Sequence, residues 1–233
     1  MQRTLEPELM IEENQSQAYA QADFATPNIH FVNLFQHKFG KDFAGRILDL
    51  GCGNADITLR FAKTYPNCSI DGIDGSPAML EHGRIALENE ATSIQKRVNL
   101  IEGIIPEVTL PQSHYDAIIS NSVLHHLHHP YLLWQFIKAY GTSGTKVFIG
   151  DLLRPANQKK AWETVETYAR DEANILKEDF YHSLLAAFEI PEIESQLKSA
   201  DLECLSVEQI SDRHVLISGF LPEKEKDRNA LIG

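Results

Sequence analysis

Short apolar runs and amphipathic stretches alternate along the first two thirds of the chain. The runs have the length of buried strands, and they lie at residues 46–50, 69–73, 98–101, 117–120 and 147–150. Apolar positions recur at helical spacing in the segments 26–39, 55–66 and 76–91. Strands that are apolar throughout and alternate with helices form parallel sheets covered on both faces. The pattern therefore predicts an α/β fold with right-handed crossovers.

The alternation of strand-like and helix-like segments ends after Asp151. Residues 155–188 contain no strand candidate but show helical spacing, which predicts a helical insertion. A helix near 193–200 and strands near 203–209 and 214–220 follow. The turn between these two strands is short, so they are expected to form an antiparallel hairpin.

Composition and charge narrow the class of protein. The chain has 233 residues, with 21 Lys and Arg against 33 Asp and Glu, and its formal net charge is -12. No basic patch is concentrated anywhere, so nucleic acid is a disfavoured partner. The three cysteines have no CxxC spacing, which suggests neither a disulfide framework nor a zinc site. With no signal peptide and no long apolar run in the sequence, we expect a cytoplasmic protein without a membrane span.

A glycine turn follows the first predicted strand, in the sequence ILDLGCGNADIT at residues 47–58. Dinucleotide-binding turns need a third glycine or alanine where this chain has Asp56. Carboxylates at Asp49 and Asp56 would repel a pyrophosphate, whereas they suit a cation such as a sulfonium that carries an α-ammonium group. The turn therefore favours S-adenosylmethionine over a dinucleotide.

A second acid, Asp74, ends the second predicted strand in the sequence IDGIDGSPAML. A carboxylate at this place can accept hydrogen bonds from both hydroxyls of a ribose. Ser76 and Pro77 are typical of a helix start, and Met79 is placed to lie along a flat base. The alternative for Asp74 is a loop acid or a helix cap.

Four segments occur together in the order and at the spacings of a known family: ILDLGCGNADIT, IDGIDGSPAML, NLIEGIIPEV and YDAIISNSVLHHLHHP. The chain resembles the class I S-adenosylmethionine-dependent methyltransferases, most of all the ubiquinone/menaquinone type that acts on small molecules. The resemblance implies a Rossmann-like, seven-stranded, mostly parallel sheet with an antiparallel last strand and helices on both faces. It also implies an N-terminal helical lid (1–44), a methyltransferase domain (45–221) with its insertion at about 155–188, and a charged tail (222–233).

The resemblance also assigns cofactor roles by position. Asp49, Gly51 and Gly53 would border the methionine moiety, and Asp74 would hold the ribose. Other positions would line the adenosine, face the methionine end or cover the cofactor, namely Gly75, Ser76, Met79, Gly103, Ile104, Asn121, Tyr19 and Phe24. Ile104 stands where many relatives have an acid that binds the adenine amino group. Simple helix packing is the alternative for Tyr19 and Phe24.

The tract HHLHH at residues 125–129 raises the question of a metal. His125 and His129 would share a face of a continuous helix, but Pro130 interrupts it and no third ligand stands at zinc spacing nearby. We therefore expect no metal. The tract resembles a stretch of the family that serves architecture or lines the substrate pocket, and His125 or His126 is a candidate substrate contact or base.

Substrate walls are expected from the N-terminal helices, the loop after Asn121 and the insertion. Candidate contacts are Arg154, Tyr168, Tyr181 and His182, each of which also has an ordinary structural explanation. We expect in-line methyl transfer from S-adenosylmethionine to a small molecule. Other possibilities are methylation of protein or tRNA, modification of the sulfonium methyl group, a cofactor sensor and a non-catalytic subunit. The sequence leaves the oligomeric state open, a homodimer included.

Overall fold

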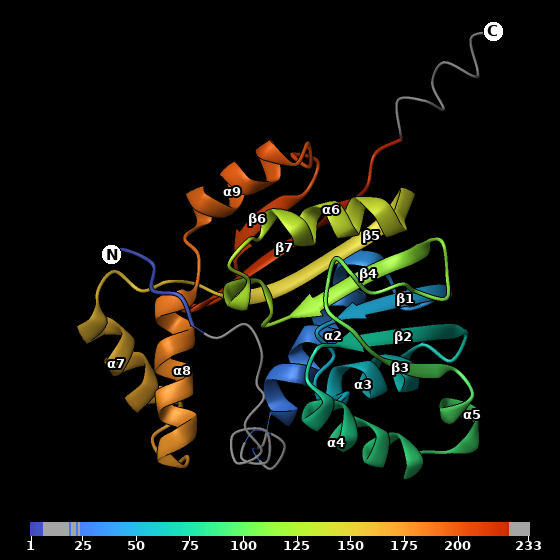
Figure 1. The fold of residues 1–233 in the computed structure, drawn as a ribbon, viewed down its shortest axis with the longest axis horizontal. Coiled ribbons are helices and arrows are strands. Elements are labelled where there is room, and N and C mark those ends of the chain that lie inside the picture. The colour runs from blue at the N-terminus through green and yellow to red at the C-terminus, as the bar shows by residue number, and fades with distance from the viewer. Residues whose placement is uncertain (7–18, 20–21, 23, 224–233) are drawn as a thin grey trace, which may run out of the picture.

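The computed structural model describes residues 1–6, 19, 22 and 24–223, and a single sheet organises them (Figure 1). Its seven strands lie in the order β3-β2-β1-β4-β5-β7-β6. Their bounds are β1 Gly45–Leu50, β2 Cys68–Asp74, β3 Val98–Glu102, β4 Tyr115–Asn121, β5 Gly141–Leu152, β6 Ser206–Gln209 and β7 His214–Phe220. The strand order reverses direction between β1 and β4, which makes that crevice the switch point where α/β sheets bind ligands.

Strand direction agrees with the prediction. β1 to β5 pair in parallel, so their carboxyl ends share one edge of the sheet. β7 pairs antiparallel with both β5 and β6, and the last two strands form the predicted hairpin. The mostly parallel, seven-stranded sheet with an antiparallel last strand is therefore confirmed.

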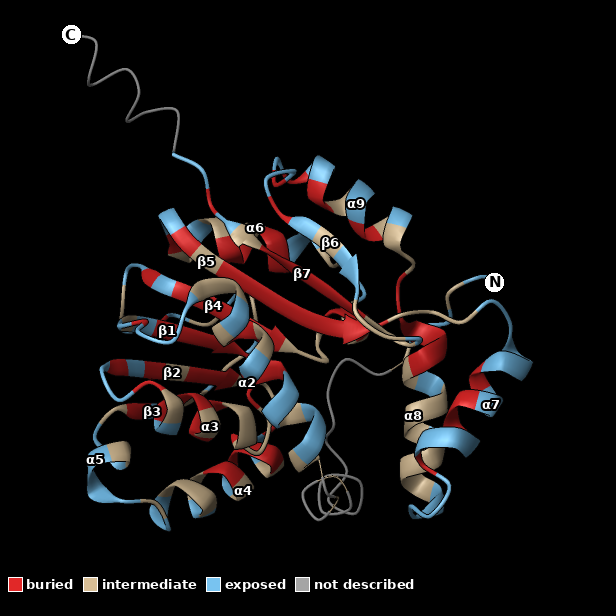
Figure 2. Ribbon diagram, turned by 180° about the vertical axis from the view of Figure 1, so that it is seen from behind, coloured by how far each residue is buried: buried red, intermediate tan, exposed pale blue. Residues whose placement is uncertain are grey.

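Helices cover both faces of the sheet. The helical elements are α2 Ala25–Phe39, α3 Asp56–Thr64, α4 Pro77–Glu88, α5 Thr92–Gln95, η1 Leu124–His126, α6 Tyr131–Tyr140, α7 Gln158–Tyr168, α8 Asn174–Ala186 and α9 Ile190–Ser199. Alternate residues of a strand serve opposite cores: Ile47 packs with α2 and α3, whereas Leu48 packs with α6 and α9. The strands are consequently buried along most of their length (Figure 2).

The insertion forms the helix pair α7 and α8, beyond the carboxyl ends of the parallel strands (Figure 1). It has a small core of its own, in which Val165 of α7 meets Leu184 of α8 and Leu152 at the end of β5. The pair contributes nothing to the two cores that flank the sheet. It is therefore an addition at the edge where the loops of the sheet gather.

Local details differ from the sequence prediction. Helix α2 begins at Ala25, one residue before the predicted segment, and has no side-chain cap. Strand β5 is longer than the predicted 147–150: it starts at Gly141, which pairs with Tyr115, and continues past a register shift to Leu152. The expected helix over 11–24 falls mostly outside the described residues. The chain restarts as α6 directly after Pro130, as the proline predicts.

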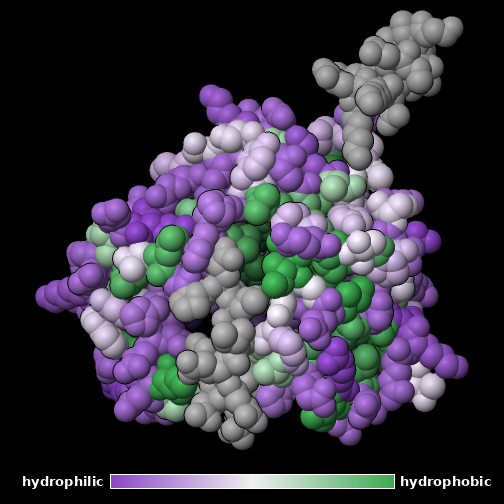
Figure 3. Space-filling model, in the orientation of Figure 1, coloured by the Kyte–Doolittle hydropathy of each residue, from purple (hydrophilic) through white to green (hydrophobic). Residues whose placement is uncertain are grey.

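The surface adds two observations. The face shown in Figure 3 is mainly hydrophilic, and its apolar residues gather toward the middle, where the central strands end. Within the described residues, no helix is both long and apolar enough to cross a membrane.

Candidate functional site

The glycine turn after β1 is tied to the neighbouring strand. The backbone N–H groups of Gly51 and Cys52 both donate to the carbonyl of Ile73, at 2.8 and 2.9 Å. Gly51 has φ +70°, and a Cβ there would lie 2.2 Å from Val123 Cγ2 in the loop after β4. Only glycine fits this left-handed position and this close approach. The turn therefore presses against the loop that follows β4, at the switch point of the sheet.

Asp74 joins the glycine turn to the start of α4. Its Oδ2 accepts from the backbone N–H of Gly53 at 2.8 Å, and its Oδ1 accepts from that of Ser76 at 2.8 Å. Ser76 Oγ in turn accepts from the backbone N–H of Met79, so Ser76 caps α4 as predicted. A carboxylate offers about four lone pairs, so Asp74 keeps acceptor capacity for further hydroxyl donors.

Asp49 lies beneath the turn and is 2% exposed. Thr58 Oγ1 donates to its Oδ2 at 2.5 Å. Burial raises the pKa of Asp49 to about 7; the Thr58 hydrogen bond opposes this, and the charge of Asp74 adds to it. Burial also raises the pKa of Asp74. Among the described residues, no cationic side chain contributes to either shift. Within the described part of the chain, Asp49 and Asp74 thus lie together at the turn without a cationic partner.

Asp56 has a different role from the one expected from the sequence. Its carboxylate accepts from Arg60 at 2.6 and 3.1 Å, one helical turn on, and from Asn28 Nδ2 at 2.7 Å. The charge of Asp56 is therefore matched by the chain itself at the start of α3. The second carboxylate that accompanies Asp49 is Asp74, and the expectation for Asp56 is corrected.

The loop after β4 faces the glycine turn. Ser122 adopts a left-handed conformation with φ 59°, which is uncommon for a residue other than glycine. Its backbone N–H donates to the carbonyl of Gly150, and Asn121 Nδ2 donates to Ser122 Oγ at 3.2 Å. Such strain is typical of functional loops that the surrounding structure holds in place.

The expected adenosine wall lies along α4 and the segment after β3. Met79 is 5% exposed, and a Cβ on Gly53 would lie 3.1 Å from its Cε. The backbone N–H of Gly103 donates to the carbonyl of Asp74 at 3.0 Å. Gly75 joins Asp74 to Ser76 at the end of β2. Ile104 is 51% exposed, so this apolar side chain has solvent access at the place of the family's acid.

Tyr19 lies close to the carboxylates of Asp56 and Asp74. Its ring centroid is 4.6 Å from that of Phe24. Burial raises the pKa of the Tyr19 phenol to about 12, and the charges of Asp56 and Asp74 contribute. The two aromatic residues that the sequence nominates as a lid therefore contact each other, and Tyr19 is near Asp74.

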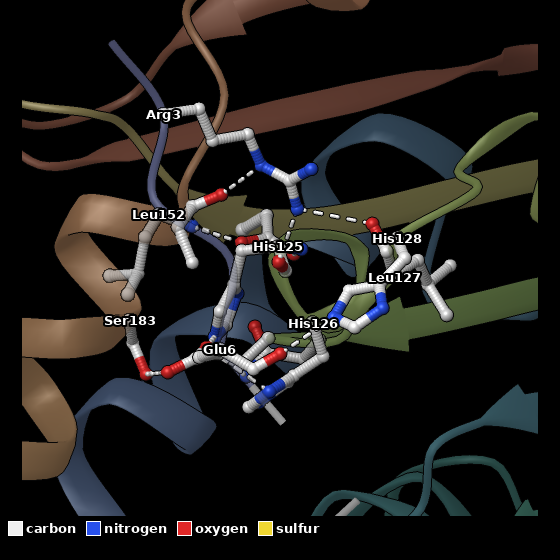
Figure 4. Close-up of polar contacts among 12 residues, drawn as sticks. Arg3, Glu6, His125, His126, Leu127, His128, Leu152 and Ser183 are labelled. Carbon is white, nitrogen blue, oxygen red and sulfur yellow. Dashed lines mark hydrogen bonds and ion pairs between the residues drawn. The ribbon is translucent and has the colours of Figure 1, made fainter. Parts of the chain in front are cut away.

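The histidine tract begins in the short helix η1. His125 is 2% exposed, and its Nδ1 donates to Asp151 Oδ1 at 2.6 Å. Burial lowers the pKa of His125, but the charge and hydrogen bond of Asp151 outweigh it, so that the pKa lies above its ordinary value. Glu6 Oε1 lies 3.5 Å from His125 Nε2 and 3.1 Å from His126 Nδ1 (Figure 4). The histidines thus face a carboxylate from the first residues of the chain.

Comparison with known proteins agrees with this geometry. A family described as "Methyltransferase domain" matches residues 47–140. An uncharacterized methyltransferase of Mycobacterium tuberculosis is 22% identical over 153 residues, covering 66% of this chain and 74% of the relative. An uncharacterized methyltransferase of Schizosaccharomyces pombe is 33% identical over 36% of this chain and 32% of the relative. For the ubiquinone/menaquinone biosynthesis C-methyltransferase of Geobacter sp., the identity is 35% over 34% of this chain and 34% of the relative. The chain thus spans about a third of the length of the last two.

Solved structures share the fold over nearly the whole chain. A plantazolicin methyltransferase in complex with a pentazolic desmethyl analogue and SAH has a TM-score of 0.64 at 17% identity, covering 88% of this chain and 90% of the other. The chain thus matches a methyltransferase domain over residues 47–140 and shares the fold of a methyltransferase solved with SAH.

In the structure, Arg154 is already paired. Its Nη2 lies 2.8 Å from Glu192 Oε1 and 3.1 Å from Glu189 Oε1, and its side chain is 4% exposed. The arginine therefore anchors α9 to the end of β5, and its charge is not free for an anionic substrate. The sequence nominates Arg154 as a substrate clamp because it cannot show these acids, which lie more than thirty residues further along the chain.

The three other substrate candidates of the methyltransferase do not converge on one point. Tyr168 donates its hydroxyl to Asp212 Oδ2 at 2.7 Å and is 47% exposed. Tyr181 stacks on Trp162, with centroids 4.2 Å apart, and this contact joins α7 to α8. His182 is exposed beside Tyr181. Tyr181 therefore joins the two helices of the insertion, and Tyr168 ties the insertion to the turn before β7.

Sequence reasoning missed two acids that lie against His125. Asp151 appears in the sequence only as the end of a strand, and Glu6 lies in a polar stretch without periodicity. The one local signal for Asp151 is a buried acid at the carboxyl end of a central strand, an edge at which α/β proteins place functional groups.

Proposed function

We propose that the protein binds S-adenosylmethionine in the crevice between β1 and β4 and transfers its methyl group to a small molecule. The observation that carries the proposal is the pair of carboxylates, Asp49 and Asp74, which surround the glycine turn without a cationic partner among the described residues. A sulfonium cofactor with an α-ammonium group supplies the missing positive charge. A pyrophosphate would be repelled.

Each group at the turn then has a role. Asp74 accepts the ribose hydroxyls, and its two backbone hydrogen bonds hold the carboxylate in place. Asp49, Gly51, Gly53 and Asn121 border the methionine end. Tyr19 covers the cofactor. The adenosine is lined by the remaining expected residues, namely Gly75, Ser76, Met79, Gly103 and Ile104.

Methyl transfer needs little from the protein in acid–base terms. The acceptor attacks the methyl carbon in line with the C–S bond, the bond electrons leave with sulfur, and the cofactor becomes a neutral thioether. The protein therefore contributes alignment, proximity and exclusion of water. An acceptor that must lose a proton needs a base, and His125 or His126 is the proposed group.

A small acceptor fits the charge and the architecture. The net charge of -12 opposes binding to RNA. The helix pair α7–α8 stands beyond the sheet edge that holds the proposed cofactor site, so the insertion is proposed as one wall of the acceptor site (Figure 1). The N-terminal segment, 1–44, is proposed as the lid. Relatives are named for small or carrier-bound acceptors, including a malonyl-[acyl-carrier protein] O-methyltransferase of Bacillus cytotoxicus.

Calorimetry tests cofactor binding first. Titration of the full chain with S-adenosylmethionine and with S-adenosylhomocysteine should show saturable binding of one equivalent. Absence of binding would refute the whole proposal.

Turnover then tests the reaction. A panel of small acceptors is scored by formation of S-adenosylhomocysteine, with unfractionated tRNA and a protein extract as parallel arms. Turnover with a small acceptor supports the proposal. Turnover confined to tRNA or protein contradicts the acceptor class. Binding without turnover in any arm would favour a cofactor sensor or a non-catalytic subunit.

A further inference from the structure

Three potential metal ligands from two distant segments meet beside the carboxyl end of β4. Glu6 Oε1 lies 3.1 Å from His126 Nδ1 and 3.5 Å from His125 Nε2. One ligand atom of each residue lies within 4.8 Å of the other two. Figure 4 shows the carboxyl group of Glu6 pointing toward the two imidazoles, which come from adjacent positions of η1.

The separations match those of a coordination sphere. Ligands at the usual zinc distances of about 2.0–2.2 Å stand about 3.3 Å apart when the geometry is tetrahedral. The two contacts of Glu6 Oε1 bracket this value. Two imidazoles and one carboxylate are also a ligand set of catalytic zinc sites and of non-haem iron sites. The cluster needs only small side-chain rotations to hold one ion.

Hydrogen bonds on the outer side of the cluster also favour metal binding. His125 Nδ1 lies 2.6 Å from Asp151 Oδ1, and a proton on Nδ1 leaves the lone pair of Nε2 on the side of Glu6. A carboxylate behind a ligating histidine is the usual outer partner in metal sites. Ser183 Oγ donates to Glu6 Oε2 at 3.3 Å, which leaves Oε1 as the oxygen that faces the imidazoles.

The backbone of the cluster is held from both segments. Arg3 Nη2 donates to the carbonyls of His125 and Leu127, at 2.7 and 3.1 Å, and Arg3 Nε donates to that of Ala186 at 2.5 Å. His128 Nε2 lies 2.8 Å from the carbonyl of Glu6. Ligands fixed in this way lose little freedom on binding an ion.

A network of hydrogen bonds without an ion is the alternative. In that case Glu6 Oε1 would accept from the ring nitrogens beside it. Among the described residues, however, no donor reaches this buried oxygen with hydrogen-bond geometry, although two nitrogens lie within 3.5 Å. The alternative therefore leaves this buried oxygen without the hydrogen bond that buried acceptors normally have.

We propose that Glu6, His125 and His126 bind a divalent transition-metal ion, with Zn²⁺ as the reference ion. Three protein ligands leave a coordination position open, as in catalytic rather than structural zinc sites. The cluster lies at the same edge of the sheet as the glycine turn. On the proposed function, an oxygen of the methyl acceptor would fill the open position. The bound ion would then favour loss of its proton, and His125 and His126 would serve as ligands instead of as the base.

The test measures metal binding alone, without cofactor or acceptor. The full chain is stripped with a chelator and titrated with Zn²⁺ by calorimetry and with Co²⁺ by visible absorption. One equivalent should bind, and Co²⁺ should give ligand-field bands of a low-symmetry site. Glu6→Gln and His126→Ala should weaken Zn²⁺ binding by more than the roughly 10–100-fold that loss of an outer partner costs.

His129→Ala is the matched control, because His129 is an exposed residue of the same tract. It should bind Zn²⁺ like the unaltered protein. Equal affinity in all four proteins, or no binding by the unaltered chain, would overturn the proposal. Each variant is also titrated with S-adenosylmethionine, which shows that it is folded. That titration keeps failure of the metal site distinct from failure of the proposed function.

Discussion

Two carboxylates, the buried Asp49 and the half-buried Asp74, dominate the proposed cofactor site at the scale of single residues. Asp74 is fixed by backbone donors from both flanking loops, and Asp49 is held by one hydroxyl from α3. Removing a carboxyl group from water favours its neutral form unless a cation or strong donors compensate. The site therefore carries an electrostatic cost in the free protein, which a bound cation removes.

Replacing Asp74 tests the ribose assignment. Asp74→Asn removes a charged acceptor, and loss of a charged hydrogen bond costs about 1.5–3 kcal/mol. We expect S-adenosylmethionine affinity to fall by roughly 10–150-fold in calorimetry. Asp42→Asn is the control, because Asp42 is exposed just before the amino end of β1. An Asp74→Asn protein with unchanged affinity would show that the ribose binds elsewhere.

The raised pKa of Asp49 should make the stability of the free protein depend on pH. Its pKa is about 7 in the folded chain, against an ordinary value near 4 when unfolded. The unfolded chain loses the proton first, so stability falls as pH rises from about 4 to about 7 and stays lower above that. Asp49→Asn should be more stable than the unaltered protein at pH 8, by about 1.4 kcal/mol for each unit of pKa shift.

Urea denaturation at pH 8 and at pH 4.5, without cofactor, measures this difference. At pH 4.5 the advantage of Asp49→Asn should be mostly gone. An advantage of equal size at both pH values would mean that the carboxyl of Asp49 keeps its ordinary pKa.

The parts of the site that the sequence reveals are those held by local chemistry. Asp74 and Ser76 are recognisable because a strand end, a helix cap and a proline stand within a few residues of each other. Glu6 and Asp151 are not, because contacts across the whole chain bring them to His125. The sequence nominates Arg154 as a substrate clamp because it does not show the partners of this arginine. Those partners, Glu189 and Glu192, lie more than thirty residues further along the chain.

At the scale of elements, the loops after β1 and β4 fit each other closely. The fit depends on Gly51, whose missing side chain leaves room for Val123. Strand and helix order could be predicted because both faces of each strand are apolar over a short run. The length of β5 could not, because its first residues are polar and pair through tertiary contacts.

Gly51→Ala should disrupt this fit. The new Cβ would lie 2.2 Å from Val123 Cγ2, at φ +70°. We expect a large loss of S-adenosylmethionine affinity in calorimetry and a lower melting temperature. Gly144→Ala is the matched control: its φ is +81° but no atom lies within 4 Å of the new Cβ, so it should cost only the backbone strain, about 1–2 kcal/mol.

The double variant Gly51→Ala with Val123→Ala separates the two causes. Partial recovery of affinity would identify the clash as the main effect. No recovery, with equal damage from Gly144→Ala, would assign the effect to backbone strain instead.

At the scale of the molecule, Arg154 links the sheet, the insertion and α9. Its guanidinium reaches the carbonyl of Ala187 at the end of α8 as well as Glu189 and Glu192 at the start of α9. A buried cation in this position favours one arrangement of the segments it joins. The insertion and the last part of the chain therefore share one anchor at the end of β5.

Arg154→Met should destabilise the protein without weakening cofactor binding. Removing one partner of a buried ion pair costs about 3–5 kcal/mol, and the partly exposed glutamates reduce this to about 1–3 kcal/mol. Urea denaturation measures the loss, and calorimetry should show unchanged S-adenosylmethionine affinity. Lys160→Met, which breaks the exposed pair with Glu163, should change stability by less than about 1 kcal/mol. A stable Arg154→Met protein would contradict the anchor.

The separate core of α7 and α8 has an evolutionary consequence. Substitutions in this helix pair change the packing of its own small core. They leave the packing of the two cores that flank the sheet unchanged. On the proposed function, acceptor preference can therefore change, for example by grafting another helix pair between β5 and α9, while the residues around the glycine turn stay the same. A library of variants confined to residues 155–188 would test different acceptors while the sheet and its flanking helices keep their sequence.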